Sequence, residues 1–257
     1  MAEKTTLYLI DASSYVYRAF FALPSLTNPA GTPTNAVYGF TTMLLKLLRE
    51  TGATHVAAVF DAPGKNFRHV AYPEYKANRE AMPDELRGQI PLVHEVVDAL
   101  GVRRIAVDGV EADDVIASLA KRLAGHDVDV VVITGDKDLM QIVGPHVRLW
   151  DTMRDRWFDV AEVERRMGVP PSQVADVLGL MGDSVDNVPG VKGVGEKTAK
   201  ALIAAFGSVD GLLADLDRLA EEKPVRGAAK LAERLRDGGE ADQARRSRDL
   251  FELRTIV

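Results

Sequence analysis

The feature of the sequence that most limits its possible folds is an alternation of strand-like and helix-like segments over about the first 150 residues. The sequence VDVVVIT at residues 128–134 is apolar and β-branched apart from its one aspartate, which is typical of a strand buried on both faces of a sheet. Further strands are expected at residues 7–10, 55–60, 103–107 and 147–150. Helices are expected at residues 36–49, 84–100 and 112–123, with a short one after Asp138. This alternation predicts an α/β fold with a mostly parallel central sheet and helices on both faces.

The pattern changes near residue 160. The hairpin-like sequence LWDTMRDRWFD closes the alternating part, and the residues after it are almost wholly helical in pattern. We therefore expect an α/β core at residues 1–160 and a helical region at residues 161–257 packed on it; a chain of 257 residues can bury a core of that size. The apolar sequence at residues 251–257 has no polar tail, which favours a cut inside a longer polypeptide.

Composition narrows the class of protein. The chain has no cysteine, so disulfides and thiolate zinc sites are excluded, and its short N-terminal apolar stretch is neither a signal peptide nor a membrane anchor. A cytoplasmic protein with no membrane contact is expected. The formal net charge of −6 argues at first against a nucleic-acid partner. That argument weakens when nine acids are counted separately, namely those that follow the expected strands or lie in the sequence GDSVDN. The rest of the chain then has 29 acidic and 32 basic side chains.

Acidic residues follow the strands at the points where the strands end. They are Asp11, Asp61, Asp136 and Asp138, with Glu111, Asp113 and Asp114 after the third strand. The carboxyl ends of parallel strands lie along one edge of a sheet, where such folds place their sites. Two more acids, Asp183 and Asp186, stand three residues apart in the sequence GDSVDN. We expect these carboxylates to share one pocket.

Each acid also has an ordinary structural explanation. Asp11 suits a helix N-cap, Asp61 and Asp108 suit turns, and the acids at residues 111–114 suit a helix N-terminus. We keep that explanation for Asp108 alone. The other acids together favour a different one, because like charges at this density raise one another's pKa unless cations lie between them. The sequence therefore predicts a site for two or more Mg²⁺ or Mn²⁺ ions, which are hard cations that take oxygen ligands.

A glycine-rich loop lies between two expected helices, in the sequence VPGVKGVGEKTAKALIAAF. Its glycines leave backbone N–H groups open and its lysines add positive charge, which suits a phosphate group. On its own such a loop is more often plain architecture. Beside a metal pocket it favours a grip on a phosphodiester backbone without base readout.

The segment at residues 65–87 interleaves basic and aromatic side chains. That combination suits a flexible single strand of nucleic acid, whose bases stack while its phosphates pair. A solvated loop with two core tyrosines is the rival explanation. The position of the segment directly after Asp61 places it over the predicted pocket and favours the functional interpretation.

Five stretches together resemble, in order and spacing, motifs of the 5′-nuclease (flap endonuclease) family. They are LIDASSYVYRAFFAL, VFDAPGKNFRHVAYPEYKANR, GVEADDVIA, TGDKDLMQ and GLMGDSVDNVPGVKGVGEKTA. The likeness runs from about residue 5 to the end, and it is greatest to those members that form the N-terminal 5′→3′ exonuclease domain of bacterial DNA polymerase I. A stand-alone bacterial flap exonuclease is the nearest alternative. The resemblance implies polymerase domains after this chain, a helical arch over the active site at about residues 64–90 and a helix–three-turn–helix at about residues 174–206.

The resemblance also implies roles for single residues. Asp11, Asp61, Glu111, Asp113 and Asp114 would build the first metal site, and Asp136, Asp138, Asp183 and Asp186 would build or support the second. Lys76 and Arg79, in the arch, would be catalytic and help draw the scissile phosphate onto the metals. The implied DNA contacts are Tyr17, Arg18, Arg68, Tyr72, Gly190, Lys192, Gly193, Gly195, Lys197 and Thr198, with K⁺ as a further ion at the helix–three-turn–helix.

The function that the resemblance implies is that of a structure-specific 5′ nuclease. Such an enzyme hydrolyses phosphodiesters at 5′ ends and 5′ flaps of branched or nicked DNA, RNA-primed strands included, in primer removal and repair. No side chain offers itself as a general base, so metal-assisted hydrolysis is expected, by a monomer in the bacterial cytoplasm at the nucleoid. A metal-dependent ribonuclease and a non-catalytic junction-binding module remain alternative functions. The second is less favoured, because a cluster of negative charge does not help a protein to bind phosphate groups. A phosphatase with Asp11 as nucleophile is disfavoured, because Ser13 stands where a second acid is needed.

Overall fold

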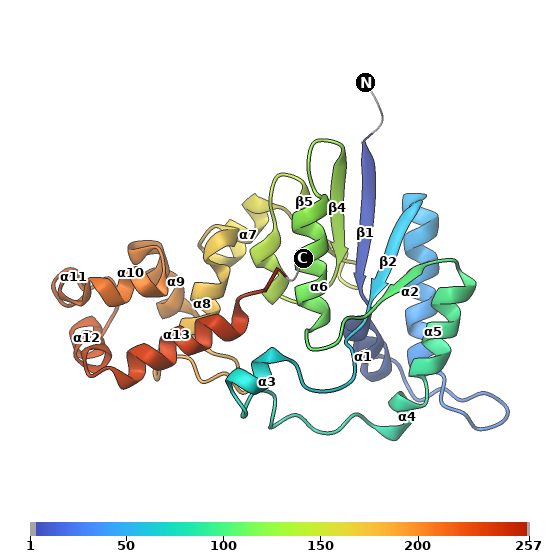
Figure 1. Ribbon diagram of the computed structural model, residues 1–257, viewed down its shortest axis with the longest axis horizontal. Coiled ribbons are helices and arrows are strands. Elements are labelled where there is room, and N and C mark those ends of the chain that lie inside the picture. Colours follow the sequence, from blue (N-terminus) through green and yellow to red (C-terminus); the bar gives the residue numbers. More distant parts are fainter. Residues whose placement is uncertain (1–3, 256–257) are drawn as a thin grey trace.

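A six-stranded sheet in the order β3-β2-β1-β4-β5-β6 forms the centre of the computed structural model, which describes residues 4–255 (Figure 1). The strands are β1 (Thr5–Asp11), β2 (His55–Val59), β3 (Arg103–Ile105), β4 (Val128–Ile133), β5 (Val147–Asp151) and β6 (Arg156–Phe158). The first five are parallel, and β6 runs antiparallel to β5. The predicted mostly parallel sheet is confirmed, as is the hairpin that closes it.

Helices connect the strands and continue after them. Those up to the hairpin are α1 (Ala12–Ala22), α2 (Asn35–Thr51), α3 (Phe67–Ala71), α4 (Asp84–Arg87), α5 (Ile90–Ala99), α6 (Ala112–Leu123) and the 3-10 turn η1 (Asp138–Ile142). Those after it are α7 (Val160–Met167), η2 (Pro171–Gln173), α8 (Val174–Met181), α9 (Glu196–Phe206), α10 (Val209–Ala214), α11 (Leu216–Glu222), α12 (Ala228–Arg236) and α13 (Gly239–Phe251). Within residues 4–255, no helix has both the length and the apolar character that crossing a membrane requires.

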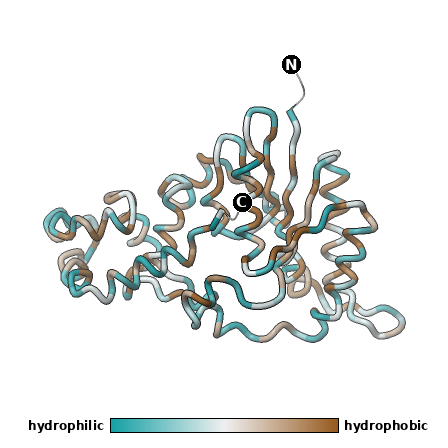
Figure 2. The backbone as a smooth tube through the Cα atoms, in the orientation of Figure 1, coloured by the Kyte–Doolittle hydropathy of each residue, from teal (hydrophilic) through white to brown (hydrophobic). Residues whose placement is uncertain are grey.

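The two faces of the sheet are covered by different helices. Successive strand residues point to opposite faces, so Leu9 and Val132 pack with α6 and α8, whereas Ile10 and Val131 pack with α1, α2 and α5. Figure 2 shows the strands as largely hydrophobic chain between these helices. Burial on both faces explains why the strands are continuous apolar runs rather than alternating ones.

The C-terminal helices pack on the sheet domain and share its core. One cluster of buried residues runs from Val132 in β4 through Leu178 in α8 to Leu202 in α9 and Phe251 in α13. Figure 1 shows α13 bringing the chain back from the outer helices, so that its described end lies near α6. Residues 256 and 257, part of the apolar terminal segment singled out in the sequence, lie outside the described residues.

The segment at residues 64–90 is less helical than expected. Its regular parts are α3 and α4, and residues 72–83 between them form turns and irregular chain. Proline lacks a backbone N–H, and Pro73 and Pro83 bound that irregular stretch. The single helix predicted at residues 84–100 is likewise wrong, because α5 begins anew at Ile90 with a proline in its first turn, a position that suits a helix start.

Candidate active site

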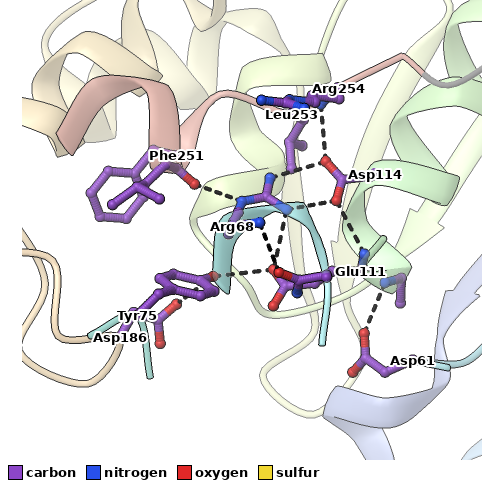
Figure 3. Close-up of polar contacts among 12 residues, drawn as sticks. Asp61, Arg68, Tyr75, Glu111, Asp114, Asp186, Phe251, Leu253 and Arg254 are labelled. Carbon is purple, nitrogen blue, oxygen red and sulfur yellow. Dashed lines mark hydrogen bonds and ion pairs between the residues drawn. The ribbon is translucent and has the colours of Figure 1, made fainter. Parts of the chain in front are cut away.

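Asp11 and Asp61 lie at the ends of the neighbouring strands β1 and β2. Asp11 is buried; one of its carboxylate oxygens accepts from the Ser14 N–H at 3.2 Å, which caps α1, and the other accepts from the Thr134 hydroxyl at 2.8 Å. Asp61 accepts a hydrogen bond of 2.8 Å from the backbone N–H of Ala112, at the start of α6 (Figure 3). The two carboxylates therefore hold the ends of β1, β2 and β4 and the start of α6 together.

The other acids come from the end of β4 and from the loop between α8 and α9. Asp136 accepts from the backbone N–H of Asp138 at 2.9 Å, which folds the TGDKD sequence into a tight turn. Asp183 lies near the start of the α8–α9 loop, where backbone hydrogen bonds of 2.9 and 2.8 Å between Asp183 and Val188 close residues 183–188 into a turn. Lys137 connects the two regions, since its Nζ lies 2.6 Å from a carboxylate oxygen of Asp183.

Burial and mutual repulsion raise the pKa of four of these carboxyl groups. Burial, followed by the charge of Asp136, raises the pKa of Asp11 to about 7. Burial raises the pKa of Asp113 well above its ordinary value, and the charges of Asp11 and Asp136 add to the effect. Burial also raises the pKa of Asp136. The pKa of Asp138 is raised by burial and, next, by the charge of Asp136. Because these groups respond to one another's charge, they share one environment, which a cation would stabilise.

Basic side chains neutralise the acids that border this environment. The pairs are Lys76–Glu111 and Lys137–Asp183, with nitrogen–oxygen distances of 2.5 and 2.6 Å, and Arg79–Asp186. Burial opposes the charge of Glu111, but Lys76 and Arg68 outweigh it, and the pKa of Glu111 is lowered overall. Lys76, Arg79, Glu111 and Asp186 line one small cavity together with Asp113, Asp136 and Asp138. The expected arch residues are therefore within reach of the expected metal site.

The irregular part of the 64–90 segment is fixed to the α8–α9 loop. The backbone N–H of Lys76 donates to the carbonyl of Asp186 at 2.9 Å, and the side-chain amide of Asn187 donates to the carbonyl of Glu74 at 2.7 Å. Lys76 and Asn187 both have a φ of 56°, a left-handed conformation that is uncommon for residues other than glycine. Such conformations cluster at functional sites, where surrounding contacts hold them.

Arg68 and Asp114 lie in a different place from the one expected. Both are buried, with exposed fractions of 2% and 0%, and the Arg68 guanidinium donates to the two Asp114 oxygens at 2.6 and 2.9 Å (Figure 3). Asp114 also accepts from the backbone N–H groups of Glu111 and Arg254, so its four lone-pair positions are occupied. An enclosed guanidinium cannot reach DNA. We therefore leave Arg68 out of the DNA contacts and Asp114 out of the proposed ligand set.

A basic cavity of about 520 Å³ adjoins the acids on the side of α1 and the β5–β6 hairpin. Its charged lining residues are Arg18, Lys137, Arg154, Arg156 and Arg166 against Asp136 and Asp151. Arg18 lies against Gly135, where any Cβ would collide with its guanidinium, and its buried Nη1 lies 3.6 Å from a carboxylate oxygen of Asp151. Asp136 lines this cavity as well as the acidic one. The two cavities therefore meet at Asp136.

The glycine-rich loop combines close packing with an open backbone. A Cβ on Gly190 would collide with the backbone of Gly182, whereas the space beside Gly193 and Gly195 is open. Gly195 is the N-cap residue of α9. Exposed beside this open backbone are Lys192 and Lys197, with Thr198 half-buried. The loop thus presents backbone and positive charge outward, as a phosphate-binding loop does.

The two tyrosines expected to contact DNA differ in exposure. Tyr17 on α1 is 37% exposed and stacks on Phe21, with ring centroids 6.4 Å apart. Tyr72 is half-buried and packs against the large core cluster. Tyr17 is therefore open to a ligand, whereas Tyr72 has at least a partly structural role.

The donor chemistry of the acidic cavity fits divalent cations. The acids offer hard oxygen ligands, and Oδ1 of Asp138 is buried without a hydrogen-bond partner in the described part of the chain. Among the described residues, no group of three or more acidic, histidine or cysteine side chains is gathered into a ready-made ligand set. Lysine and arginine side chains stand between the acids instead. The residues therefore fit divalent ions in type and burial, and ion binding would have to replace the present ion pairs.

Acids at the carboxyl edge of a parallel sheet, with basic residues on both borders, indicate a class of protein that binds divalent cations beside a surface for phosphate groups. Comparison with known proteins narrows the class. Sequence profiles of the 5′-3′ exonuclease N-terminal resolvase-like domain and of the 5′-3′ exonuclease C-terminal SAM fold match residues 6–168 and 169–257. The chain belongs to the 5′-3′ exonuclease family.

Individual relatives agree with this assignment. The chain is 48% identical over 256 residues to DNA polymerase I of Pseudomonas aeruginosa. The aligned region covers 99% of this chain and 28% of that protein. It is 42% identical over 219 residues to the 5′-3′ exonuclease of Aquifex aeolicus, covering 85% of this chain and 76% of that protein. The T5 flap endonuclease pseudo-enzyme–product complex with DNA and metal ions has the same fold, with a TM-score of 0.74 at 22% identity over 96% of this chain and 89% of that one. The chain spans about a quarter of the DNA polymerase I relatives.

Three residues that contact the site acids were not predicted from the sequence to do so. The buried hydroxyl of Tyr75 donates to Glu111 at 3.1 Å, Thr134 donates to Asp11, and Lys137 pairs with Asp183. Thr134 and Lys137 lie beside predicted acids in TGDKD, so adjacency within that motif was an available signal. Tyr75 was weighed from the sequence only as one of the interleaved aromatic residues or core tyrosines of the 65–87 segment, and its contact with Glu111 depends on the irregular path of the 64–90 segment.

Proposed function

We propose that this chain is a structure-specific 5′ nuclease that hydrolyses phosphodiester bonds at 5′ ends and 5′ flaps of DNA with Mg²⁺ or Mn²⁺. One observation carries the proposal: the buried Asp11 and the half-buried Asp113, Asp136 and Asp138 share one environment, in which desolvation and neighbouring negative charges raise the pKa of each group. A protein that only bound DNA would gain nothing from such a group facing a phosphate. Family membership supports the same reaction.

The proposed ligands come from both groups of acids. They are Asp11, Asp61, Glu111 and Asp113 for one ion, and Asp136, Asp138, Asp183 and Asp186, acting directly or in support, for another. When bound, the ions supply activation of water and stabilisation of the charge that develops on the phosphate oxygens. The protein supplies the carboxylates that would hold the ions and the surrounding structure that keeps those carboxylates in place.

Lys76 and Arg79 are proposed to act on the scissile phosphate. In the structure they pair with Glu111 and Asp186, which are also proposed ligands. Divalent ions at those carboxylates would release both side chains, since the carboxylates would then pair with the ions. The released cations would stand at the edge of the same cavity and stabilise negative charge on the phosphate.

Two basic surfaces are proposed to hold the DNA backbone on either side of the acids. One is the cavity lined by Arg18 and Arg166, whose positive charges would attract a phosphate. The other is the loop between α8 and α9, with Lys192 and Lys197 and a K⁺ ion as a further bridge to a phosphate. Neither surface requires base readout, which suits an enzyme that recognises structure rather than sequence. The exposed ring of Tyr17 is proposed to stack on a base.

The biological setting belongs to the proposal as well. The DNA polymerase I relatives, of which this chain spans about a quarter, support a position ahead of polymerase domains. In that position a 5′ nuclease removes primers and displaced strands during replication and repair, RNA-primed ends included. We propose a monomer that acts on DNA of the bacterial nucleoid in the cytoplasm.

The test is cleavage of matched substrates by the purified protein. A duplex with a 5′ DNA flap, the same duplex with an RNA flap and the unflapped duplex would each be incubated with Mg²⁺, Mn²⁺, Ca²⁺ or EDTA. The proposal expects release of short 5′ products from the DNA flap in Mg²⁺ or Mn²⁺ only. Cleavage of the RNA flap alone would instead indicate a ribonuclease, and binding without cleavage in any divalent salt would indicate a junction-binding module.

A further inference from the structure

A buried ion pair at the base of the 64–90 segment joins three parts of the chain that are distant in sequence. Arg68 belongs to α3, and Asp114 belongs to the first turn of α6. Residues 250–254 comprise the last two residues of α13 and the three residues after it. We refer to residues 250–254 as the C-terminal strap. Figure 3 shows the strap passing over the guanidinium of Arg68 and the carboxylate of Asp114.

The strap is bound to both members of the ion pair through its backbone. Arg68 donates from Nε to the carbonyl of Leu250 at 2.7 Å and from Nη2 to the carbonyl of Glu252 at 3.2 Å. The backbone N–H of Arg254 donates to Oδ1 of Asp114 at 2.9 Å. Because these contacts use backbone atoms, they depend on the path of the strap and not on its side chains.

Two further contacts fix the same path. The side-chain amide of Gln141 donates to the carbonyl of Phe251 at 3.0 Å and accepts from the backbone N–H of Leu253 at 3.0 Å. The guanidinium of Arg254 lies 3.7 Å from the centroid of the Phe67 ring, a cation–π distance. The strap is thus held by η1 on one side and by α3 on the other.

The ion pair also determines how the acids of α6 are presented. Oδ2 of Asp114 accepts from the backbone N–H of Glu111 at 3.1 Å, and Nη1 of Arg68 lies 3.4 Å from a carboxylate oxygen of Glu111. Asp113 stands between Glu111 and Asp114 in the chain and lines the acidic cavity. The direction of both proposed ligands therefore depends on where Asp114 is anchored.

We propose that Arg68 and Asp114 are positioning residues of the nuclease site, and that the docked C-terminal strap is needed for Glu111 and Asp113 to bind a divalent ion tightly. The inference rests on the proposed function and adds to it a part of the chain far from the acids in sequence. Residues that hydrogen-bond to metal ligands affect the metal affinity, because they fix the orientation of those ligands. A buried charge left without its partner does not stay in place, because it must find water or another partner.

A matched pair of substitutions in the strap tests the inference. Arg254→Ala and Arg254→Pro both remove the side chain from Phe67, but only Arg254→Pro also removes the backbone N–H that binds Asp114. We expect Arg254→Pro to weaken Mn²⁺ binding, measured by calorimetry, about 10-fold or more relative to Arg254→Ala. In flap cleavage the kcat should fall while the KM for DNA stays the same. A merely structural strap would lower the unfolding temperature without changing the Mn²⁺ affinity of the folded protein, and equal affinities in the two folded variants would overturn the proposal.

Gln141→Ala provides the second variant, should Arg254→Pro not fold. It removes two hydrogen bonds to the strap and leaves the Arg68–Asp114 pair intact. A weaker Mn²⁺ affinity supports the proposal, and an unchanged affinity in this folded variant overturns it. Arg68→Lys, which keeps the charge but loses the two-pronged geometry, should retain more Mn²⁺ affinity than Arg68→Met. Wild-type protein that neither binds Mn²⁺ nor cleaves a flap would defeat the proposed function itself, whereas an active wild type with unaffected variants defeats this inference alone.

Discussion

The Nζ of Lys76 lies 2.5 Å from a carboxylate oxygen of Glu111, so a basic side chain from the 64–90 segment occupies a place beside a proposed metal ligand. The pair neutralises Glu111 and keeps Lys76 at the edge of the acidic cavity. A substrate and its ions would thus exchange partners with Lys76 rather than draw it from solution.

Removing Lys76 should therefore separate catalysis from ion binding. We expect Lys76→Met to slow cleavage about 100-fold, the loss typical of one charge-stabilising group. Mn²⁺ affinity should not fall, since a competing positive charge beside Glu111 is gone. Single-turnover cleavage and calorimetry with Mn²⁺ measure the two quantities, and Lys65→Met is a control in the same segment. Equal losses of cleavage rate and duplex affinity would show that Lys76 merely docks DNA.

Asp136 should be essential for cleavage and dispensable for DNA binding, because it lines both the acidic and the basic cavity but belongs to the proposed ligands. Asp136→Ala is expected to abolish flap cleavage in Mg²⁺ while flap binding in Ca²⁺, followed by fluorescence anisotropy, stays within a few-fold of wild type. Asp108→Ala, an exposed acid beyond the end of β3, is the control and should cleave normally. Wild-type rates in Asp136→Ala would refute the ligand assignment.

The sheet and the gathering of acids were predictable because both result from local patterns. Continuous β-branched runs such as residues 128–134 require burial on both faces, and parallel strands bring their carboxyl ends to one edge. Asp11, Asp61 and Asp136 are near one another for that reason alone. Even the N-cap explanation weighed for Asp11 proves compatible with a site, since one of its oxygens caps α1 while it remains in the acidic group.

The features that could not be predicted depend on contacts between distant parts of the chain. Arg68 has the sequence context of a surface base in a basic and aromatic segment, yet its partner stands 46 positions away and the strap more than 180 positions away. No local pattern distinguishes a buried arginine from an exposed one. The irregular path of residues 72–83 likewise results from contacts with the α8–α9 loop, such as that between Lys76 and Asp186, and not from helical propensity.

The raised pKa of Asp11 predicts how the metal-free protein responds to pH. Its pKa rises from an ordinary 3.8 to about 7 in the folded protein, so folding favours the protonated group. This contribution to stability is complete below about pH 4 and is lost as the pH rises through 7, with a slope of at most about 1.4 kcal/mol per pH unit for one proton. In EDTA the unfolding temperature should fall between pH 5 and pH 8.

Two comparisons check the cause of that slope. Asp11→Asn, which cannot ionise, should flatten the pH dependence measured by calorimetry in EDTA. Added Mg²⁺ should raise the unfolding temperature more at pH 8 than at pH 5, because the ion replaces a proton that the acids hold at the lower pH. A slope that is the same in Asp11→Asn and wild type would show that other groups cause it.

The basic cavity gives the last prediction, because α7 carries two adjacent arginines with different surroundings. Arg166 lines the cavity, whereas Arg165 pairs with Glu162 on the helix surface at 2.7 Å. If a DNA phosphate enters the cavity, Arg166→Ala should weaken flap binding in Ca²⁺ and lower the dependence of log affinity on log salt concentration by about 1, the effect of one lost phosphate contact. Arg165→Ala removes the same charge from the same helix, so a general loss of positive charge would affect both variants alike. Identical affinities and salt slopes for the two would place the DNA backbone elsewhere, and a difference confined to Arg166 would place it beside Asp136, where the two cavities meet.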